Sequence, residues 1–334
     1  MSDARTGGLA AAGAAILFGS SFVATAVALR LFGPLAIGAW RGTVATAVVG
    51  FLVFRRSLAG RAELARLDRA GWLRLIVLGG LGGPVFIVAM NVAVGASGAT
   101  ITAFAAGLYA VLAALLGPIL LRERLGPAAV VAFGIALGGT ALLAEIDPLS
   151  GGVAAGASGV PAGLLGALSF ALYLVLTRRW GRRWALPGSI VALANFAACA
   201  AVLVPLALLF ERPPFPVATD PDTGPAILAV GWLVVGPSIL AQILLITAVH
   251  RLPARESAAY LLLNPIAATG LAAVLLGERL TPIQQLGAGL ILAAIALATG
   301  LPRAIAAIHG VSDRGAAARD GEAPEVPVDG SDPG

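Results

Sequence analysis

The chain has 334 residues, of which 59% are hydrophobic and only 12% are charged. Soluble domains carry about 25% charged residues, so this composition excludes a water-soluble globular protein. The net charge of +5 comes from arginine, and the arginines lie between apolar runs. That placement indicates orientation in a membrane and argues against nucleic acid as a partner.

Uninterrupted apolar runs of about 20 residues, the length of a bilayer-spanning helix, recur along the chain. Gly and Pro separate most of them, as at Gly33-Pro34 and Thr281-Pro282. The first run is predicted to be an uncleaved helix. Residues 302–334 lack apolar rhythm and are predicted to form a disordered cytoplasmic tail. Ten membrane-spanning helices are predicted in an all-α polytopic protein, at 8–29, 35–54, 72–93, 98–121, 127–144, 161–177, 188–210, 226–249, 257–276 and 282–301.

The arginines predict the orientation of these spans. With the N-terminus inside, Arg30, Arg212 and Arg279 fall in outside segments and Arg41 falls within the second span. The other eighteen of the 22 basic residues fall inside. Basic residues favour the cytoplasmic side. We therefore expect a multi-pass protein of the cytoplasmic (inner) membrane with both termini in the cytoplasm.

One charged octapeptide occurs twice in the sequence with small differences. The sequence "LLRERLGP" at 120–127 returns as "LLGERLTP" at 275–282, and residues 91–144 align with 246–299 at the same offset without gaps. The chain is thus predicted to hold two five-helix repeats, at 1–145 and 160–301. Because five is odd, the second copy enters the membrane from the opposite side. Such inverted repeats are typical of secondary transporters that bind their solute near the bilayer midplane.

The stretch "LFGSSFVATAVAL" in the first span, Arg41 in the second and "LLLNPIAATGLAAVLLGERLTPIQQLGAGLILAAIAL" near the end resemble the EamA-type branch of the drug/metabolite transporter superfamily. This resemblance covers nearly all of residues 8–301. It implies ten helices around a central cavity and the transport of amino acids, sugars, nucleobases or similar metabolites. The family often has a proline in the middle of the fourth span, where this chain has Ala110, with Pro118 further along.

Polar residues on the predicted helix faces form the candidate solute site. Asn264 lies one and two turns beyond Tyr260 and Ser257 on one stripe of the ninth span, and Thr102 and Tyr109 occupy the equivalent stripe of the fourth. For any single member, bonding between helices is as good an explanation as solute contact. The full predicted set is Ser21, Arg41, Asn91, Thr102, Tyr109, Ser169, Tyr173, Ser238, Gln242, Ser257, Tyr260 and Asn264. Helix breaks are predicted beside it at Gly83, Pro84, Gly236, Pro237 and Pro265.

Charged residues inside the spans are scarce, and no aspartate lies within any of them. Glu256 is the candidate for ion coupling. We expect the two glutamates of the repeated octapeptide to cap helices rather than relay protons. For Arg41, bonding to a carbonyl of a neighbouring helix or reaching to the outer interface is favoured over solute contact. The carboxylates expected at span ends are Glu123, Glu145, Glu256 and Glu278.

The sequence offers little for catalysis or for metal binding, with one cysteine, Cys199, and two histidines. We expect no enzyme activity, cofactor or metal. The pairs Gly134-x-x-x-Gly138 and Gly289-x-x-x-Ala293 predict close helix packing within a monomer, with a homodimer interface as the alternative. The predicted function is outward transport of a small polar metabolite by alternating access. The alternative is translocation of a lipid or lipid-linked solute on the same scaffold.

Overall fold

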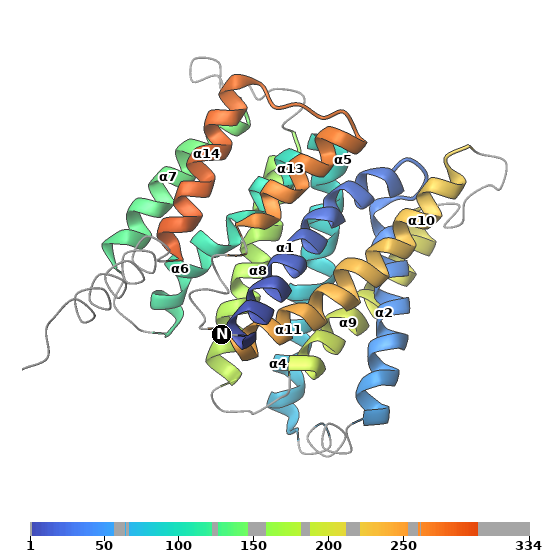
Figure 1. Cartoon of the computed structure of the whole chain (residues 1–334). Coiled ribbons are helices and arrows are strands. Elements are labelled where there is room, and N and C mark those ends of the chain that lie inside the picture. The colour runs from blue at the N-terminus through green and yellow to red at the C-terminus, as the bar shows by residue number, and fades with distance from the viewer. Residues whose placement is uncertain are drawn as a thin grey trace, which may run out of the picture.

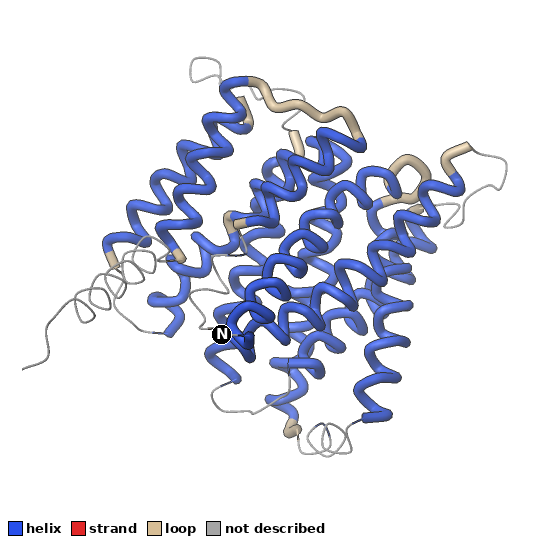
Figure 2. Tube along the Cα trace, in the orientation of Figure 1, coloured by secondary structure: helices blue, strands red, loops and turns tan. Residues whose placement is uncertain are grey.

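The computed structural model describes residues 2–56, 64, 67–121, 126–145, 158–181, 188–211, 221–252, 260 and 262–299. Every regular element in these ranges is a helix, and short loops join many of them (Figure 2). The first half holds α1 (Ser2–Ala28), α2 (Pro34–Arg56), α4 (Arg69–Gly80), η1 (Leu81–Val85), α5 (Phe86–Gly107), α6 (Tyr109–Leu121) and α7 (Pro127–Leu143). The second half holds α8 (Val160–Gly181), α9 (Gly188–Phe210), α10 (Thr223–Leu233), η3 (Val234–Leu240), α11 (Ala241–Arg251), α13 (Leu263–Leu275) and α14 (Pro282–Ala298).

Six helical runs in the described ranges are long and apolar enough to cross a bilayer. One of them, Arg69–Leu121, is 53 residues long and covers the predicted third and fourth spans. Gly98 interrupts it with a φ of 80°, a conformation that glycine adopts without strain. Three shorter apolar helices, α7, α13 and α14, lie at the predicted fifth, ninth and tenth spans. In the described ranges the structure therefore confirms an all-helical fold with several helices long and apolar enough to cross a bilayer, while the count of ten stays a prediction.

Both predicted Gly-Pro breaks are real interruptions of the α-helical pattern. Gly83 and Pro84 lie in η1, and Gly236 and Pro237 lie in η3, each a single stretch of wider π-type turns. Proline lacks the N–H that the α-helical ladder needs, and π-type turns inside α-helices often mark functional places. The third predicted break differs, because Pro265 occupies the first turn of α13, where a missing N–H is tolerated.

The two halves pack against one another through pairs of helices, as Figure 1 shows. Helix α2 packs along α9, α5 along α8, and α7 along α14, while α1 packs against both α11 and α13. Each pair joins an element of residues 2–145 to an element of residues 158–299. The core is therefore built between the repeats rather than inside each one.

Glycine lets α7 and α14 approach closely, but the glycines concerned are not the predicted ones. A Cβ on Gly287 would lie 2.6 Å from the carbonyl oxygen of Gly139. A Cβ on Gly134, Gly138 or Gly289 would meet no atom of the described residues within 4 Å. The prediction of internal packing through these three residues was wrong, because they lie on faces of α7 and α14 that turn away from the contact.

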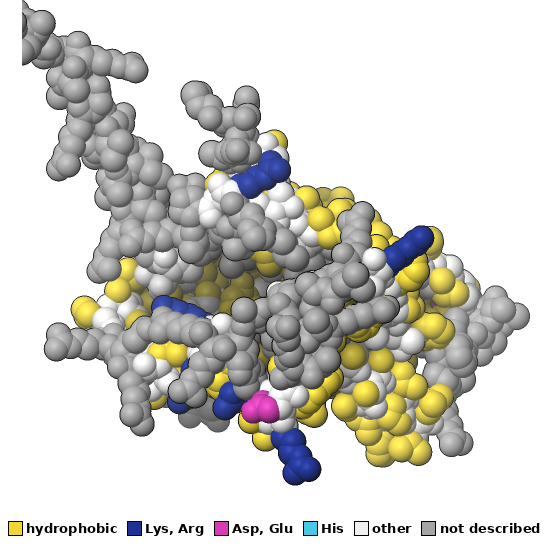
Figure 3. All heavy atoms as spheres, turned by 90° about the horizontal axis from the view of Figure 1, so that it is seen from below, with side chains coloured by type: hydrophobic (Ala, Val, Ile, Leu, Met, Phe, Trp, Pro, Cys, Tyr) yellow, Lys and Arg dark blue, Asp and Glu magenta, His cyan; other side chains and the backbone are white. Residues whose placement is uncertain are grey.

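The outer surface is largely apolar, with Val274, Phe210 and Leu228 each at least 75% exposed. Arginine side chains are conspicuous on the face seen from below in Figure 3. The C-terminal end of α2 and the N-terminal end of α4 lie at this lower end in Figure 1. An apolar belt with a basic end fits a protein embedded in a bilayer.

Candidate functional site

The second helix break is joined to the first half by Arg41. Its Nε donates to Ser238 Oγ at 2.7 Å, and Ser238 Oγ donates to Leu233 O at 2.8 Å. Leu233 O would ordinarily accept from the N–H four residues on, but that residue is Pro237. The buried Ser238 hydroxyl therefore replaces the missing donor and presents its oxygen to Arg41.

The first helix break is stabilised in a similar way, from the opposite half. Ser169 of α8 is buried and donates through Oγ to Leu81 O at 2.8 Å. The amide of Asn195 in α9 lies within hydrogen-bonding distance of Leu78 O and Val191 O. A Cβ on Gly83 would clash with Asn195 O, so only glycine permits this approach. Asn195 is a residue that sequence reasoning missed, although a lone amide within an apolar run was a usable signal.

Tyr109 of the first half and Tyr173 of the second, both predicted site residues, contact the same aromatic ring, that of Phe170. The ring of Phe170 lies 5.1 Å from that of Tyr109, edge to face, and 5.4 Å from that of Tyr173. Phe86, directly after η1, lies 4.8 Å from Phe170. The four rings form an aromatic cluster beside the first break. Phe86 and Phe170 were not predicted, because apolar residues in apolar spans carry no distinguishing signal.

Asn264 and Tyr260 pack on glycines of α1. The backbone oxygen of Asn264 would lie 2.6 Å from a Cβ on Gly19, and the hydroxyl of Tyr260 would lie 2.7 Å from one on Gly8. Asn264 Oδ1 is buried and has no hydrogen-bond partner among the described residues. A buried polar atom without a protein partner is rare and calls for a reason, of which contact with a solute is one. Ser257 and Glu256 lie outside the described residues.

Several other predicted site residues are occupied by bonds inside the protein. Asn91 Nδ2 donates to Pro34 O at 2.8 Å, and Thr102 Oγ1 donates to Gly98 O at 2.7 Å. Ser21 Oγ donates to Phe18 O of its own helix, whereas its neighbour Ser20 accepts from Trp232 Nε1 across the two halves. Gln242 of α11 is half-buried. Asn91 and Ser20 therefore link different helices, whereas Ser21 and Thr102 bond within their own, and none of these bonds brings the predicted residues into a common site.

Two glutamates of the second half cap helices of the first half. Glu278 accepts from the N–H groups of Ala99 and Thr100 at 2.8 and 2.9 Å. Glu211 accepts from those of Leu35 and Ala36 at 2.9 and 2.7 Å. We call these contacts the carboxylate clamps. The capping role expected of Glu278 is confirmed, but Glu211 had been left out of the carboxylates at span ends. Glu123 lies outside the described residues.

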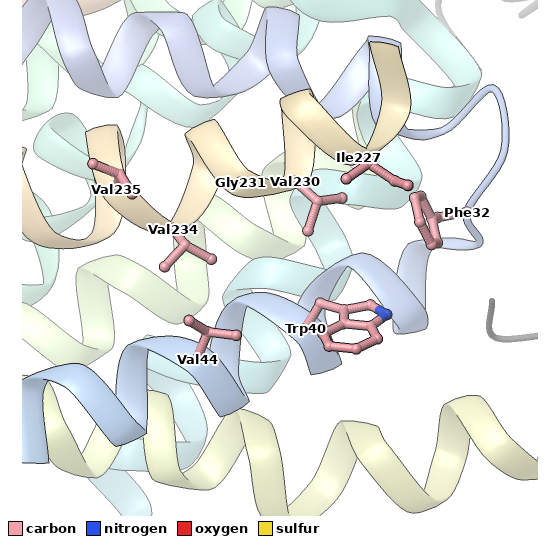
Figure 4. Close-up of a pocket in the computed structure, with 8 residues that line it drawn as sticks. All are labelled: Phe32, Trp40, Val44, Ile227, Val230, Gly231, Val234 and Val235. Carbon is pink, nitrogen blue, oxygen red and sulfur yellow. The ribbon is translucent and has the colours of Figure 1, made fainter. Parts of the chain in front are cut away.

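An apolar groove of about 410 Å³ lies between α2 and α10 with η3 (Figure 4). Its lining residues are Phe32, Trp40, Val44, Ile227, Val230, Gly231, Val234 and Val235. None of the predicted polar residues lines it, although Trp40 directly precedes Arg41 in the sequence. In the described ranges no group of three or more His, Cys, Asp and Glu residues is placed to hold a metal ion.

Comparison with known proteins identifies the family. None of the curated proteins searched matches the chain. A solved structure described only as "Crystal structure of protein" matches 90% of this chain and 99% of its own with a TM-score of 0.61 and 24% identity, which establishes a shared fold. The model of the EamA-like transporter family matches residues 5–144 and again residues 157–300. The two matches confirm both the resemblance and the two-repeat organisation. The chain belongs to the EamA-like transporter family.

Proposed function

We propose that this protein is a secondary transporter that moves a small polar metabolite out of the cell across the cytoplasmic membrane. The observation that carries the proposal is the pair of matched helix breaks, η1 and η3, one in each repeat. Interruptions at corresponding places in two repeats mark the solute site in transporters of this design. Polar side chains form hydrogen bonds at each break. They are Ser169 and Asn195 at the first and Arg41 and Ser238 at the second.

The proposed mechanism is alternating access around the region between these breaks. The packing of helices in pairs across the two halves supports it, because one half can rock against the other along continuous interfaces. The two halves would be related as inverted repeats. The unpartnered Oδ1 of Asn264 supplies an acceptor for a donor group on the solute.

The test compares the compounds outside cells that make the parent protein, Asn264→Ala, or no transporter, at equal membrane abundance. A compound should accumulate outside with the parent but not without a transporter, and about 5- to 150-fold less with Asn264→Ala, since each lost hydrogen bond to a buried partner costs about 1–3 kcal/mol. Thr247→Ala is the matched control, because Thr247 is half-buried and its hydroxyl bonds to Ile243 O of its own helix. No accumulated compound with any variant would contradict the proposal.

The apolar groove favours a second candidate, translocation of a lipid or lipid-linked solute. Trp40, Ile227 and Val235 in its wall are each at least 36% exposed on a surface that the bilayer would cover. Flipping of a fluorescent phospholipid in vesicles that contain the purified protein distinguishes the two functions. Lipid movement without export of any polar compound would favour this candidate.

A further inference from the structure

Arg41 is a cation inside a membrane span, and no carboxylate of the described residues is paired with it. Its one hydrogen bond among these residues is the 2.7 Å contact from Nε to the neutral Ser238 hydroxyl. The guanidinium has four further N–H donors on its two Nη atoms. No described Asp or Glu lies within ion-pair distance of it. By contrast, the carboxylates of Glu211 and Glu278 are occupied by backbone N–H groups.

The direction of this side chain rules out an extension to the membrane interface, one of the two explanations favoured from sequence alone. A long basic side chain near a helix end ordinarily extends that way. Arg41 instead bonds to Ser238, which is 1% exposed and lies within η3. The next residue, Gly42, packs so closely on α9 that a Cβ there would lie 2.5 Å from Cys199 Cβ. Arg41 is therefore held at the contact of three segments: α2, α9 and the second break.

An arginine in this setting carries a positive charge that no carboxylate of the described residues balances. Guanidinium stays protonated under all physiological conditions, and a charge within a membrane span is paired or faces a water-filled cavity. Its planar fork of donors matches a carboxylate, which takes two parallel N–H bonds. A carboxylate also carries a single charge and would leave the site neutral. A phosphate group, with a charge of about −1.5 to −2 at neutral pH, would leave a surplus.

We propose that the free N–H groups of Arg41 bind the carboxylate of the transported solute, so that the substrates of this protein are carboxylic acids or amino acids carrying a free carboxylate. This inference rests on the proposed transport function. Ser238 is the positioning residue, since its bond to Nε fixes the orientation of the guanidinium plane. Loss of the helix break would therefore also misplace the anion site.

The single cysteine supplies a direct test that needs no knowledge of the solute. Cys199 is fully buried between the residue that follows Arg41 and the first helix break, since it contacts Gly42 on one side and Gly83 of η1 on the other. In purified protein, its modification rate is measured with sulfonatoethyl methanethiosulfonate, an anion, and trimethylammonioethyl methanethiosulfonate, a cation. The ratio of the two rates reports the local charge and cancels effects on the reactivity of the thiol itself.

The anionic reagent should react faster with the parent, and the ratio of the two rates should fall at least about tenfold in Arg41→Gln. Arg41→Lys should keep most of the ratio, because it keeps the charge. Arg55→Gln is the matched control, since Arg55 lies near the end of the same helix over the ring of Phe51. Cys199→Ser gives the background. An unchanged ratio in Arg41→Gln, or a thiol that neither reagent modifies, overturns the proposal.

Export measurements separate this proposal from the one it rests on. Compounds exported by the parent should carry a free carboxylate, and Arg41→Gln should abolish their export while Arg55→Gln does not. Export of compounds without a carboxylate, or equal export by Arg41→Gln, overturns the anion site and leaves the transporter. A charge-selective ratio at Cys199 with no exported compound would overturn the transporter and leave the anion site.

Discussion

At the scale of single residues, the carboxylate clamps join the two halves through charge-assisted hydrogen bonds. Each clamp gives two charge-assisted hydrogen bonds to the first N–H groups of a helical segment, α2 for Glu211 and the part of α5 after Gly98 for Glu278. The helix dipole also favours negative charge at such a start. Each also closes over a glycine, Gly33 or Gly98, whose missing Cβ leaves room for the carboxylate.

We expect Glu278→Ala and Glu211→Ala each to lower the free energy of unfolding by about 1–3 kcal/mol, because each leaves two N–H groups without acceptors. Thermal unfolding of the purified proteins measures this. Glu145→Ala is the control, since its bond goes to the Thr281 hydroxyl at an exposed position and its loss should cost less. Equal melting temperatures for the parent and all three variants would show that water replaces the clamps at no cost.

At the scale of helices, sequence reasoning succeeded where a residue type has one physical consequence. Pro84 and Pro237 cannot donate to an α-helical ladder, so both breaks were predictable. Small residues have no such single consequence. The spacing of Gly134 and Gly138 matches a packing motif, but only the rotation of the helix decides whether such a stripe meets a neighbour, and that rotation is set by contacts with the other repeat. Glu211 was missed for a related reason, because its partners at Leu35 and Ala36 are 176 and 175 residues away.

The α7–α14 contact gives a matched test within a single helix. Gly287→Ala places a methyl group 2.6 Å from Gly139 O and should force the two helices apart, lowering the melting temperature. Gly289→Ala, two residues further on, meets no part of the described chain within 4 Å. It should leave stability unchanged or slightly raised, as glycine is a poor helix former. Equal destabilisation by both substitutions would instead indicate that a second protein copy covers Gly289.

At the scale of the whole molecule, the same contacts that stabilise the fold constrain how it can move. The pairs α2–α9, α5–α8 and α7–α14 join the repeats along their length, and the clamps join them at helix ends. A rocking motion of one half against the other can keep the long interfaces but must strain or release contacts at the ends. Arg41 and Ser238 lie across such an interface, so a bound carboxylate would act on both halves at once.

The orientation of this assembly is a prediction about the whole chain, and it follows from charge. Eighteen of the 22 basic residues fall on one side of the predicted ten-span arrangement, and an odd number of spans would place the tail on the opposite side and scramble this asymmetry. Green fluorescent protein fused after Gly334 should therefore fluoresce, and alkaline phosphatase fused there should be inactive, because each folds on only one side of the membrane. The same two reporters fused after Asp147 should give the reverse result, since five predicted spans precede it. Active phosphatase at both positions would require an even number of spans in the second half, and the two repeats could not then be inverted five-helix copies.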